Sequence, residues 1–217
     1  MSDIRSQLMV MIGRIAARGW APATAGNYSI RLADNPVRLL ISPSGTDKTL
    51  LRDEDLLEVS HRAEVLSGSG KTSAETLLHV VTYQERPAMS VLHVHTVWNT
   101  ILSEHCLPLG AVEIAGYEIL KALDGVTTHE HTERIPVFEN SQDMTLLSQK
   151  VKAELKRDPG VKAFLLAGHG LYTWGKTPAD AYRHLEALEF LFEVVVRKNQ
   201  MPSKGGKSTW PAYVSQS

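Results

Sequence analysis

The stretch MSVLHVHT, residues 89–96, predicts a buried β-strand that ends in a pair of histidines. His93 and His95 are two residues apart, and side chains at that spacing on a strand project from the same face. Two neutral imidazoles side by side supply half of the ligands of a typical divalent-metal site. A strand-end pair that is hydrogen-bonded to backbone is the structural alternative for the same spacing.

A third ligand is available in VKAFLLAGHGLYTWG, residues 161–175, which predicts a second buried strand and its continuation after a turn. His169 lies between two glycines at the end of that strand, where another part of the backbone can approach closely. A catalytic zinc site needs three protein ligands and an open position. His93, His95 and His169 together meet that requirement, whereas His79, on a predicted helix, is assigned a structural role.

Two carboxylates need separate interpretation. Glu118 lies in the apolar segment IAGYEILKAL, residues 114–123. Contact with apolar residues would raise its pKa and suit it to proton transfer, while a solvent-facing carboxylate is an equal alternative. Glu75 lies near the start of a predicted helix over 73–85, with Ser73 as its N-cap, where the helix dipole favours negative charge. A catalytic role for Glu75 is the alternative.

The remaining patterns predict a layered protein of the α/β or α+β class. Further helices are expected over 3–18, 97–104, 144–157 and 177–198, with strands between them. RIPVF, residues 134–138, contains a proline and is therefore expected at a sheet edge. No composition shift marks a linker, so we expect one domain over 1–200 and a loose C-terminal tail over 201–217.

Composition excludes several classes of protein. The chain has 217 residues, a formal net charge of −1 and one cysteine, Cys106. These values exclude a disulfide framework and disfavour nucleic acid as a partner. The N-terminus lacks the apolar core of a signal peptide, and no run reaches the roughly 18 apolar residues of a membrane span. We therefore expect a cytoplasmic protein that does not contact a membrane.

The stretch GSGKTSAETLLH, residues 68–79, contains the GKT of a nucleotide-binding P-loop. The full motif needs a glycine five residues before Gly70, and Val65 occupies that position. It also needs a hydrophobic strand that leads directly into the loop, and the preceding residues are short and mixed. We therefore expect no nucleotide cofactor.

Five motifs together resemble the class II aldolase/adducin-head family. They are TAGNYSIR (24–31), ISPSGTDK (41–48), KTSAETLLH (71–79), VLHVHT (91–96) and LLAGHGLYTWG (165–175). Their order and spacing match over residues 5–198, although each motif alone is modest. The resemblance implies a three-layer α/β/α sandwich around a mainly antiparallel sheet. It also implies a homotetramer with active sites near the subunit contacts.

The resemblance also implies a site. The zinc ligands, one ion per subunit, would be His93, His95 and His169, with Glu118 as general acid/base. Three small loops would hold a sugar phosphate, and their residues here are Gly26, Asn27, Ser44, Gly45, Thr72 and Ser73. Glu75 matches the catalytic carboxylate of the family's fuculose-phosphate aldolases, which leaves its role here open.

Closer matches point to one activity within the family. AVEIAGYEILKAL (111–123), PVFENSQD (136–143), and GHGLYTWG with the AYRHLEALEFLFE that follows it resemble the family's dehydratases. The implied reaction is zinc-dependent loss of water from a methylthio-substituted ketose 1-phosphate in methionine salvage, through an enediolate. A sugar-phosphate aldolase or epimerase is the first alternative. A non-catalytic scaffold like the adducin head is the second.

Overall fold

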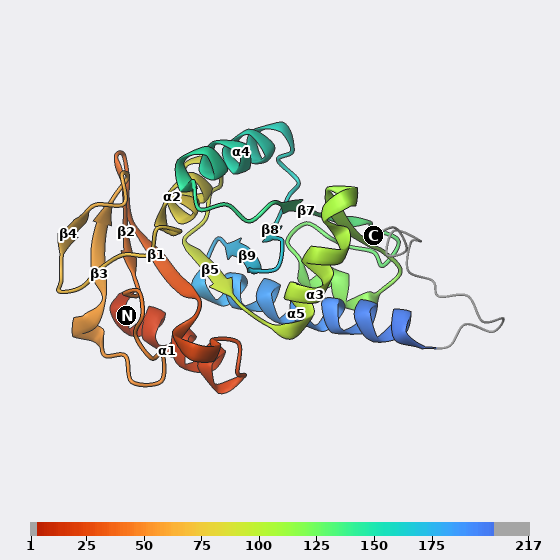
Figure 1. Cartoon of the computed structure of the whole chain (residues 1–217), viewed down its shortest axis with the longest axis horizontal. Helices are drawn as coiled ribbons and strands as arrows, with labels where there is room; N and C mark the ends of the chain where they lie inside the picture. The colour runs from red at the N-terminus through yellow and green to blue at the C-terminus, as the bar shows by residue number, and fades with distance from the viewer. Residues whose placement is uncertain (1–3, 202–217) are drawn as a thin grey trace.

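Helices cover both faces of one sheet in the computed structural model, which describes residues 4–201 (Figure 1). The α-helices are α1 (Ile4–Ala17), α2 (Thr76–Glu85), α3 (Val97–Cys106), α4 (Met144–Arg157) and α5 (Pro178–Gln200). Helices α2 and α4 pack on one face, and α1, α3 and α5 pack on the other. The predicted tail lies, apart from Met201, outside the described residues.

The sheet has nine strands in the order β4-β3-β2-β1-β5-β9-β8-β7-β6. Their bounds are β1 (Asn27–Asp34), β2 (Val37–Ile41), β3 (Leu57–Ser60), β4 (Val65–Ser67), β5 (Ser90–Val94), β6 (Ala111–Ile114), β7 (Glu133–Phe138), β8 (Ala163–Leu166) and β9 (Gly170–Gly175). Every adjacent pair is antiparallel except β7 and β8. The prediction of a three-layer α/β/α sandwich around a mainly antiparallel sheet is confirmed.

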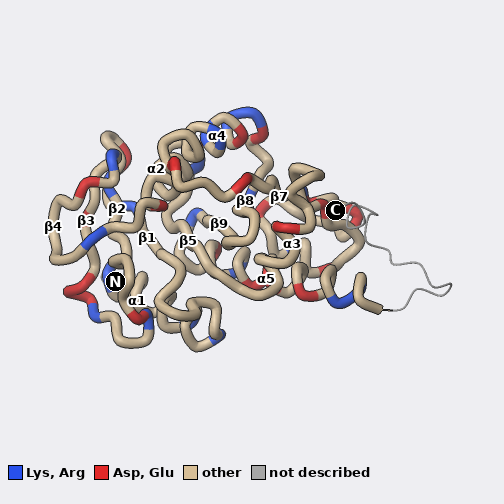
Figure 2. The backbone as a smooth tube through the Cα atoms, viewed as in Figure 1, with Lys and Arg blue, Asp and Glu red and all other residues tan. Residues whose placement is uncertain are grey.

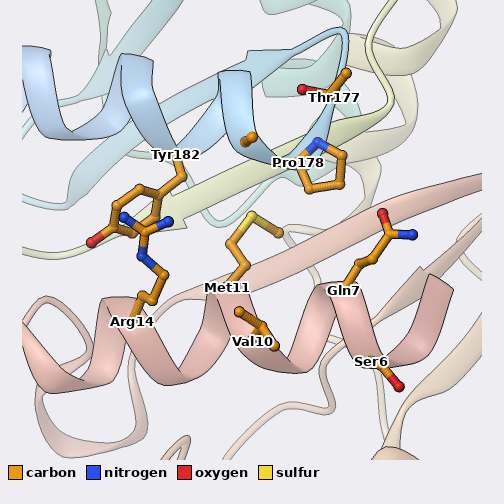
Figure 3. Close-up of a pocket in the computed structure, with 9 residues that line it drawn as sticks. Ser6, Gln7, Val10, Met11, Arg14, Thr177, Pro178 and Tyr182 are labelled. Carbon is orange, nitrogen blue, oxygen red and sulfur yellow. The ribbon is translucent and has the colours of Figure 1, made fainter. Parts of the chain in front are cut away.

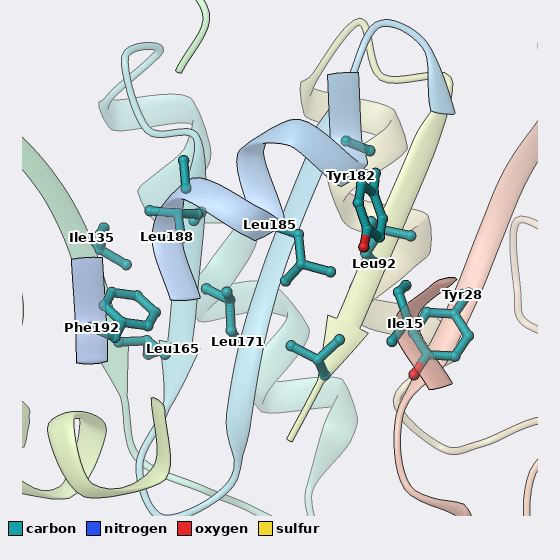
Figure 4. Close-up of a cluster of buried hydrophobic side chains, with 14 of the residues drawn as sticks. Ile15, Tyr28, Leu92, Ile135, Leu165, Leu171, Tyr182, Leu185, Leu188 and Phe192 are labelled. Atoms are coloured by element: carbon teal, nitrogen blue, oxygen red, sulfur yellow. The ribbon is translucent and has the colours of Figure 1, made fainter. Parts of the chain in front are cut away.

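The larger hydrophobic core lies beneath α5 (Figure 4). Leu185, Leu188 and Phe192 recur at helical spacing on α5, and all three are completely buried. Full burial of one such side chain contributes about 1.5–3 kcal/mol. Thr177 caps this helix by accepting a hydrogen bond from the Asp180 N–H, as its position before Pro178 predicts.

Strand β5 is central, and its register places the site residues. His93 pairs with Asn27 on β1 and with Tyr172 on β9, so these three residues lie in one row across three strands. Directly paired residues project from the same face of a sheet. The row faces α2 and α4, because Tyr172 belongs to the core cluster on that side.

Two local predictions are wrong. Helix α2 begins at Thr76 and not at Ser73, whose hydroxyl instead accepts a hydrogen bond from the Glu75 N–H at 3.2 Å. Strand β7 is not an edge strand, because β6 pairs on its outer side. Pro136 is tolerated there because the parallel pairing with β8 begins only at Val137.

Charged residues of both signs are interspersed along the backbone (Figure 2). This distribution agrees with the net charge of −1 and provides no broad field of one sign. Among residues 4–201, no helix combines the length and the apolar character that crossing a membrane requires.

Glu189 is a carboxylate buried between α5 and α3. It accepts hydrogen bonds from the Thr96 hydroxyl at 2.6 Å and from Asn99 Nδ2 at 2.8 Å. Thr96 is also the N-cap of α3, so Glu189 ties α5 to the start of that helix. Burial raises the pKa of Glu189 to about 7.

The raised pKa of Glu189 predicts a pH-dependent stability. Between pH 4.5 and about 7 the folded chain keeps a proton that the unfolded chain releases, so the free energy of unfolding falls as pH rises. Glu189→Gln keeps the shape of the side chain and an acceptor oxygen for Asn99 but has no titratable proton, so it should abolish that loss. Urea denaturation should show the variant gaining on the order of 1–3 kcal/mol relative to wild type across this window. A constant difference between the two proteins, as expected for the exposed Glu130→Gln, would contradict the assignment.

Gly175 and Gly13 predict opposite effects of the same substitution. A Cβ on Gly175 would lie 2.2 Å from the Ala181 backbone nitrogen, so Gly175→Ala must displace the start of α5. We expect a loss of about 1–3 kcal/mol. Gly13 lies exposed within α1 with nothing near its missing Cβ, so Gly13→Ala should stabilise by about 0.5–1 kcal/mol. Chemical denaturation measures both, and equal shifts would refute the packing argument.

Candidate metal centre and active site

Three histidines from two parts of the chain converge at one end of β5. His93 lies on β5 and is completely buried, His95 follows the strand by one residue, and His169 lies in the turn between β8 and β9. One ligand nitrogen from each lies within 4.8 Å of the other two. The structure therefore brings together the three residues that the sequence singled out.

A glycine allows the turn that carries His169 to approach β5. A Cβ on Gly170 would lie 2.4 Å from the Val94 carbonyl oxygen and 2.8 Å from His93 Cε1. Only glycine permits that contact without displacement of one strand. The close backbone approach expected from the two glycines around His169 is therefore present.

In His93 and His169, the outer ring nitrogen has a partner that fixes the ring. His93 Nδ1 donates to the Leu171 carbonyl at 3.0 Å, and His169 Nδ1 donates to Asn140 Oδ1 at 3.2 Å. Tyr172 stacks on His93 with ring centroids 4.0 Å apart. The Nε2 atoms consequently face the centre of the cluster, as in metal sites where a second partner orients each histidine.

The buried imidazoles are neutral near pH 7. Burial lowers the pKa of His95 to about 4 and holds that of His93 well below its ordinary value. A neutral imidazole presents a lone pair, which is the form that binds a metal. The two rings are 2.9 Å apart at Nε2.

Glu75 completes the cluster from the start of α2. Its Oε1 lies 2.9 Å from His169 Nε2, and its Oε2 lies 3.6 Å from His93 Nε2. Burial raises the pKa of Glu75, but the hydrogen bond with His169, the electrostatic effect of His93 and His169 and the hydrogen bond from Asn27 together outweigh burial and leave that pKa below its ordinary value. Glu75 is therefore an anion beside the histidines.

A chain of buried hydrogen bonds leads from Glu75 into the core. Asn27 Nδ2 donates to Glu75 Oε2 at 2.7 Å, and Asn27 Oδ1 lies 2.5 Å from His79 Nε2. The Ser29 hydroxyl lies 2.7 Å from His79 Nδ1 and 2.8 Å from the Tyr83 hydroxyl. Apart from the short contact between Asn27 and His79, these distances are typical of hydrogen bonds.

The donor and the acceptor of each hydrogen bond in this network follow from the neutral state of the His79 ring. Burial lowers the pKa of His79 to about 3, so one of its nitrogens donates and the other accepts. Since Asn27 must donate to the Glu75 carboxylate, its oxygen accepts from His79 Nε2. Nδ1 then accepts from Ser29. His79, assigned a structural role from sequence, thus fixes the amide that faces Glu75.

The donor set fits a divalent cation. Three imidazole nitrogens and a carboxylate are electron-rich, so their close approach requires protons or a cation among them. Ligands of a tetrahedral zinc, bound at about 2.0–2.1 Å, lie about 3.3 Å apart. That value falls between the 2.9 Å His93–His95 separation and the 4.8 Å limit for the whole group. Within residues 4–201 this is the one group of metal-ligating side chains that meets these distances.

A polar cavity of about 270 Å³ opens beside the histidines. Five of the six residues expected to bind phosphate line it, together with Glu75 and His95: Gly26, Asn27, Ser44, Gly45 and Ser73. Thr72 does not line this cavity and turns its hydroxyl toward the Ala63 carbonyl at 3.4 Å. Gly26 and Gly45 have φ values of +80° and +69°, which place them in the left-handed region.

A buried cation lies behind two of these loops. Lys48 Nζ donates to the Thr24 carbonyl at 3.0 Å and to the Thr46 carbonyl at 2.9 Å. Burial lowers the pKa of Lys48, and Thr24 itself lines the polar cavity. The lysine therefore joins the loop that contains Thr24 to its own loop.

Glu118 is not part of the cluster in its own chain. Glu118 begins the short η4 helix (Glu118–Ala122). Its side chain is 70% exposed and pairs with Lys121 on that helix and with His129 beyond it. The hydrogen bond from Lys121 lowers its pKa, so within a single chain the solvent-facing alternative holds and the apolar setting with a raised pKa does not. The segment is apolar in sequence, but Leu120 is the residue that points into the core.

Two larger cavities differ in their relation to the site. One of about 530 Å³ lies between α1 and the start of α5, with Met11, Arg14 and Tyr182 on its walls and none of the candidate residues (Figure 3). The other, of about 640 Å³, includes His95 in its lining. Only the second is continuous with the histidine cluster.

Sequence reasoning missed four contributors to this site. Asn140 and Tyr172 orient two of the histidines, His79 orients Asn27, and Lys48 joins the loops. Each contacts residues distant in sequence, and a spacing pattern carries no information on such contacts. Lys48 lies in the quoted motif ISPSGTDK and Asn140 lies in PVFENSQD. Their presence in these motifs was the only indication in the sequence that they contribute to the site.

Comparisons with known proteins agree with this geometry. The chain is 47% identical to a methylthioribulose-1-phosphate dehydratase of Methylococcus capsulatus over 90% of this chain and 94% of the relative. It is 42% identical to the enzyme of that name from Pseudomonas fluorescens, over 95% and 100% of the two chains.

Solved structures carry the same fold. An L-fuculose-1-phosphate aldolase from Thermus thermophilus superposes with a TM-score of 0.70 at 25% identity, over 91% of this chain and 97% of the other. The sequence also matches the family described as Class II Aldolase and Adducin N-terminal domain over residues 6–196. The chain therefore belongs to the class II aldolase and adducin N-terminal domain family.

Proposed function

We propose that this chain is a hydro-lyase that dehydrates 5-methylthioribulose 1-phosphate to 2,3-diketo-5-methylthiopentyl 1-phosphate in methionine salvage, in the cytoplasm. The observation that carries the proposal is the convergence of three histidine ring nitrogens beside a polar cavity lined by the loops expected to bind phosphate. The names of relatives that are 40–47% identical over most of their length support the same reaction.

His93, His95 and His169 hold one zinc ion per chain in this proposal. When bound, the ion supplies Lewis-acid chemistry, which polarises the C2 carbonyl and stabilises negative charge as the C3 proton leaves. The ring partners Leu171 and Asn140 keep the ligand nitrogens in place. Imidazole also suits other divalent metals, so metal analysis must identify the ion.

The phosphate is bound by the loops, and protons are moved by a carboxylate. Backbone N–H groups and the hydroxyls of Ser44 and Ser73 line the polar cavity and suit an anion. Glu118 takes the C3 proton, the resulting enediolate expels the C4 hydroxyl, and that hydroxyl leaves as water after protonation. The enol product then tautomerises to the diketone.

A homotetramer reconciles this role with the exposure of Glu118. The carboxylate pairs with Lys121 and His129, is not part of the group formed by the three ligand histidines of its own chain, and Ile119 beside it is 38% exposed. In the proposed tetramer, Glu118 enters the site of a neighbouring subunit. The phosphate loops and the histidines come from the other chain.

The position of Glu75 favours a second candidate, an aldolase or epimerase. An ionised carboxylate 2.9 Å from His169 Nε2 can move protons within its own chain. In that case Glu75 would be the acid/base, and the substrate would be a different sugar phosphate. Cleavage of fuculose 1-phosphate would favour this candidate over the dehydratase.

Metal content tests the first step of the proposal. Purified protein should hold about one divalent metal ion per chain by elemental analysis, because one group of three histidines is available. His95→Ala should lose most of that metal, and the exposed His61→Ala should keep it. A wild-type protein that binds no zinc, or equal metal content in both variants, would contradict the site and favour a non-catalytic scaffold.

Replacement of each carboxylate tests the assignment of the proton carrier. Glu118→Gln should slow formation of the diketone by about 10²–10⁴-fold, the usual effect of removing a general acid/base. Glu113→Gln, an exposed carboxylate on β6, is the control and should stay near wild type. If Glu118→Gln is fully active while Glu75→Gln forms the diketone about 10²–10⁴-fold more slowly, the proton carrier is Glu75.

A further inference from the structure

An apolar cleft of about 640 Å³ shares His95 with the polar cavity of the phosphate loops. It is formed by the segment after α1 and the first turns of α3. Its lining includes Trp20, Pro22, His95, Val97, Trp98 and Ile101, with Arg18 as its one charged side chain among the described residues. Val97 and Ile101 remain 67% and 37% exposed, so the cleft is open to a ligand.

His95 lies in the walls of both cavities, and their chemistry is opposite. The smaller cavity is lined by serines, asparagine, glutamate and glycine backbone, whereas the larger one is dominated by indole, proline and aliphatic surfaces. A molecule held at the histidine cluster can therefore contact both linings. One lining suits an anion, and the other suits an apolar group.

The walls of the apolar cleft are held in place. The His95 N–H donates to the Trp20 carbonyl at 3.3 Å, which joins the first wall directly to the cluster. The Thr96 cap and Glu189 fix the start of α3 and hence Trp98. Arg18 and Arg197 lie over the Trp20 and Trp98 rings, at 5.3 and 5.0 Å from the centroids.

We propose that this cleft binds the methylthio end of the substrate and that Trp20 and Trp98 select for it, an inference that rests on the function proposed above. In 5-methylthioribulose 1-phosphate the phosphate is attached at C1, next to the reacting carbons C2 to C4. The thioether is attached at C5, on the opposite side of those carbons. When the phosphate occupies the polar cavity, the remaining carbons lead past His95 into the cleft. A thioether is apolar and makes favourable contacts with aromatic rings.

The test compares two substrates that differ only in the thioether. One is 5-methylthioribulose 1-phosphate, and the other is 5-deoxyribulose 1-phosphate, which has hydrogen in place of the methylthio group. Trp98→Ala should lower kcat/KM for the methylthio substrate by about 10–100-fold, the range for a lost apolar contact in a pocket. The same variant should change kcat/KM for the deoxy substrate by less than about threefold. The ratio of kcat/KM for the methylthio substrate to kcat/KM for the deoxy substrate should therefore fall in Trp98→Ala.

Two further variants separate selection from stability. Ile101→Gln keeps a helix-forming residue on α3 and places a polar group in the cleft, so it should lower the same ratio. Val10→Ala changes an exposed apolar residue of the cavity between α1 and α5 and should leave the ratio unchanged. Light scattering on each variant reports the oligomeric state.

Each contrary result overturns a distinct step. Equal losses on both substrates in Trp98→Ala would show that Trp98 supports the structure without selecting the thioether. An unchanged ratio with a dissociated oligomer would show that the cleft is a contact between copies of the chain. Wild-type protein inert on both substrates would refute the proposed dehydratase function itself, and the assignment of the cleft would fall with it.

Discussion

The alignment of β5 with its two neighbours is the constraint on which the site depends. His93 pairs with Asn27 on one side and Tyr172 on the other, so a polar amide, a metal-type ligand and a stacking ring lie in one row. A shift of one residue in either pairing would move these side chains to the opposite face of the sheet. Two buried cores, one on each face, hold that register.

The site uses burial to set the charge of each group. His93, His95 and His79 are kept neutral, while Glu75 remains ionised because its hydrogen bonds and the neighbouring histidines together outweigh the effect of its burial. Neutral rings present lone pairs to a cation, and the anion beside them adds attraction. The same principle raises the pKa of Glu189, which lies away from the cluster but anchors the helix that follows His95.

The two cavities that share His95 differ in polarity, so in the proposed function they orient the substrate. A substrate with an anionic end and an apolar end has one favourable orientation between them, and the reacting carbons then lie at the histidines. Binding energy from the remote ends of a substrate can position the atoms that react. In the proposed tetramer, Glu118 is supplied by a neighbouring subunit, so the chain alone would bind and orient the substrate without its full acid/base machinery.

The sequence by itself determined the layered fold, the helix cap at Thr177 and the placement of His93 and His95 side by side. Hydrophobic period, capping residues and spacing along a strand are all local properties. It also singled out His169, although only the β8–β9 turn and Gly170 decide that this residue reaches the others. The tertiary structure alone decided the start of α2 at Thr76, the inner position of β7 and the exposure of Glu118. It alone decided that His79 orients the Asn27 amide that donates to Glu75 and that Trp98 lines the cleft beside His95. These features depend on contacts between residues far apart in the chain, and no local pattern encodes which distant side chain or strand will supply the partner.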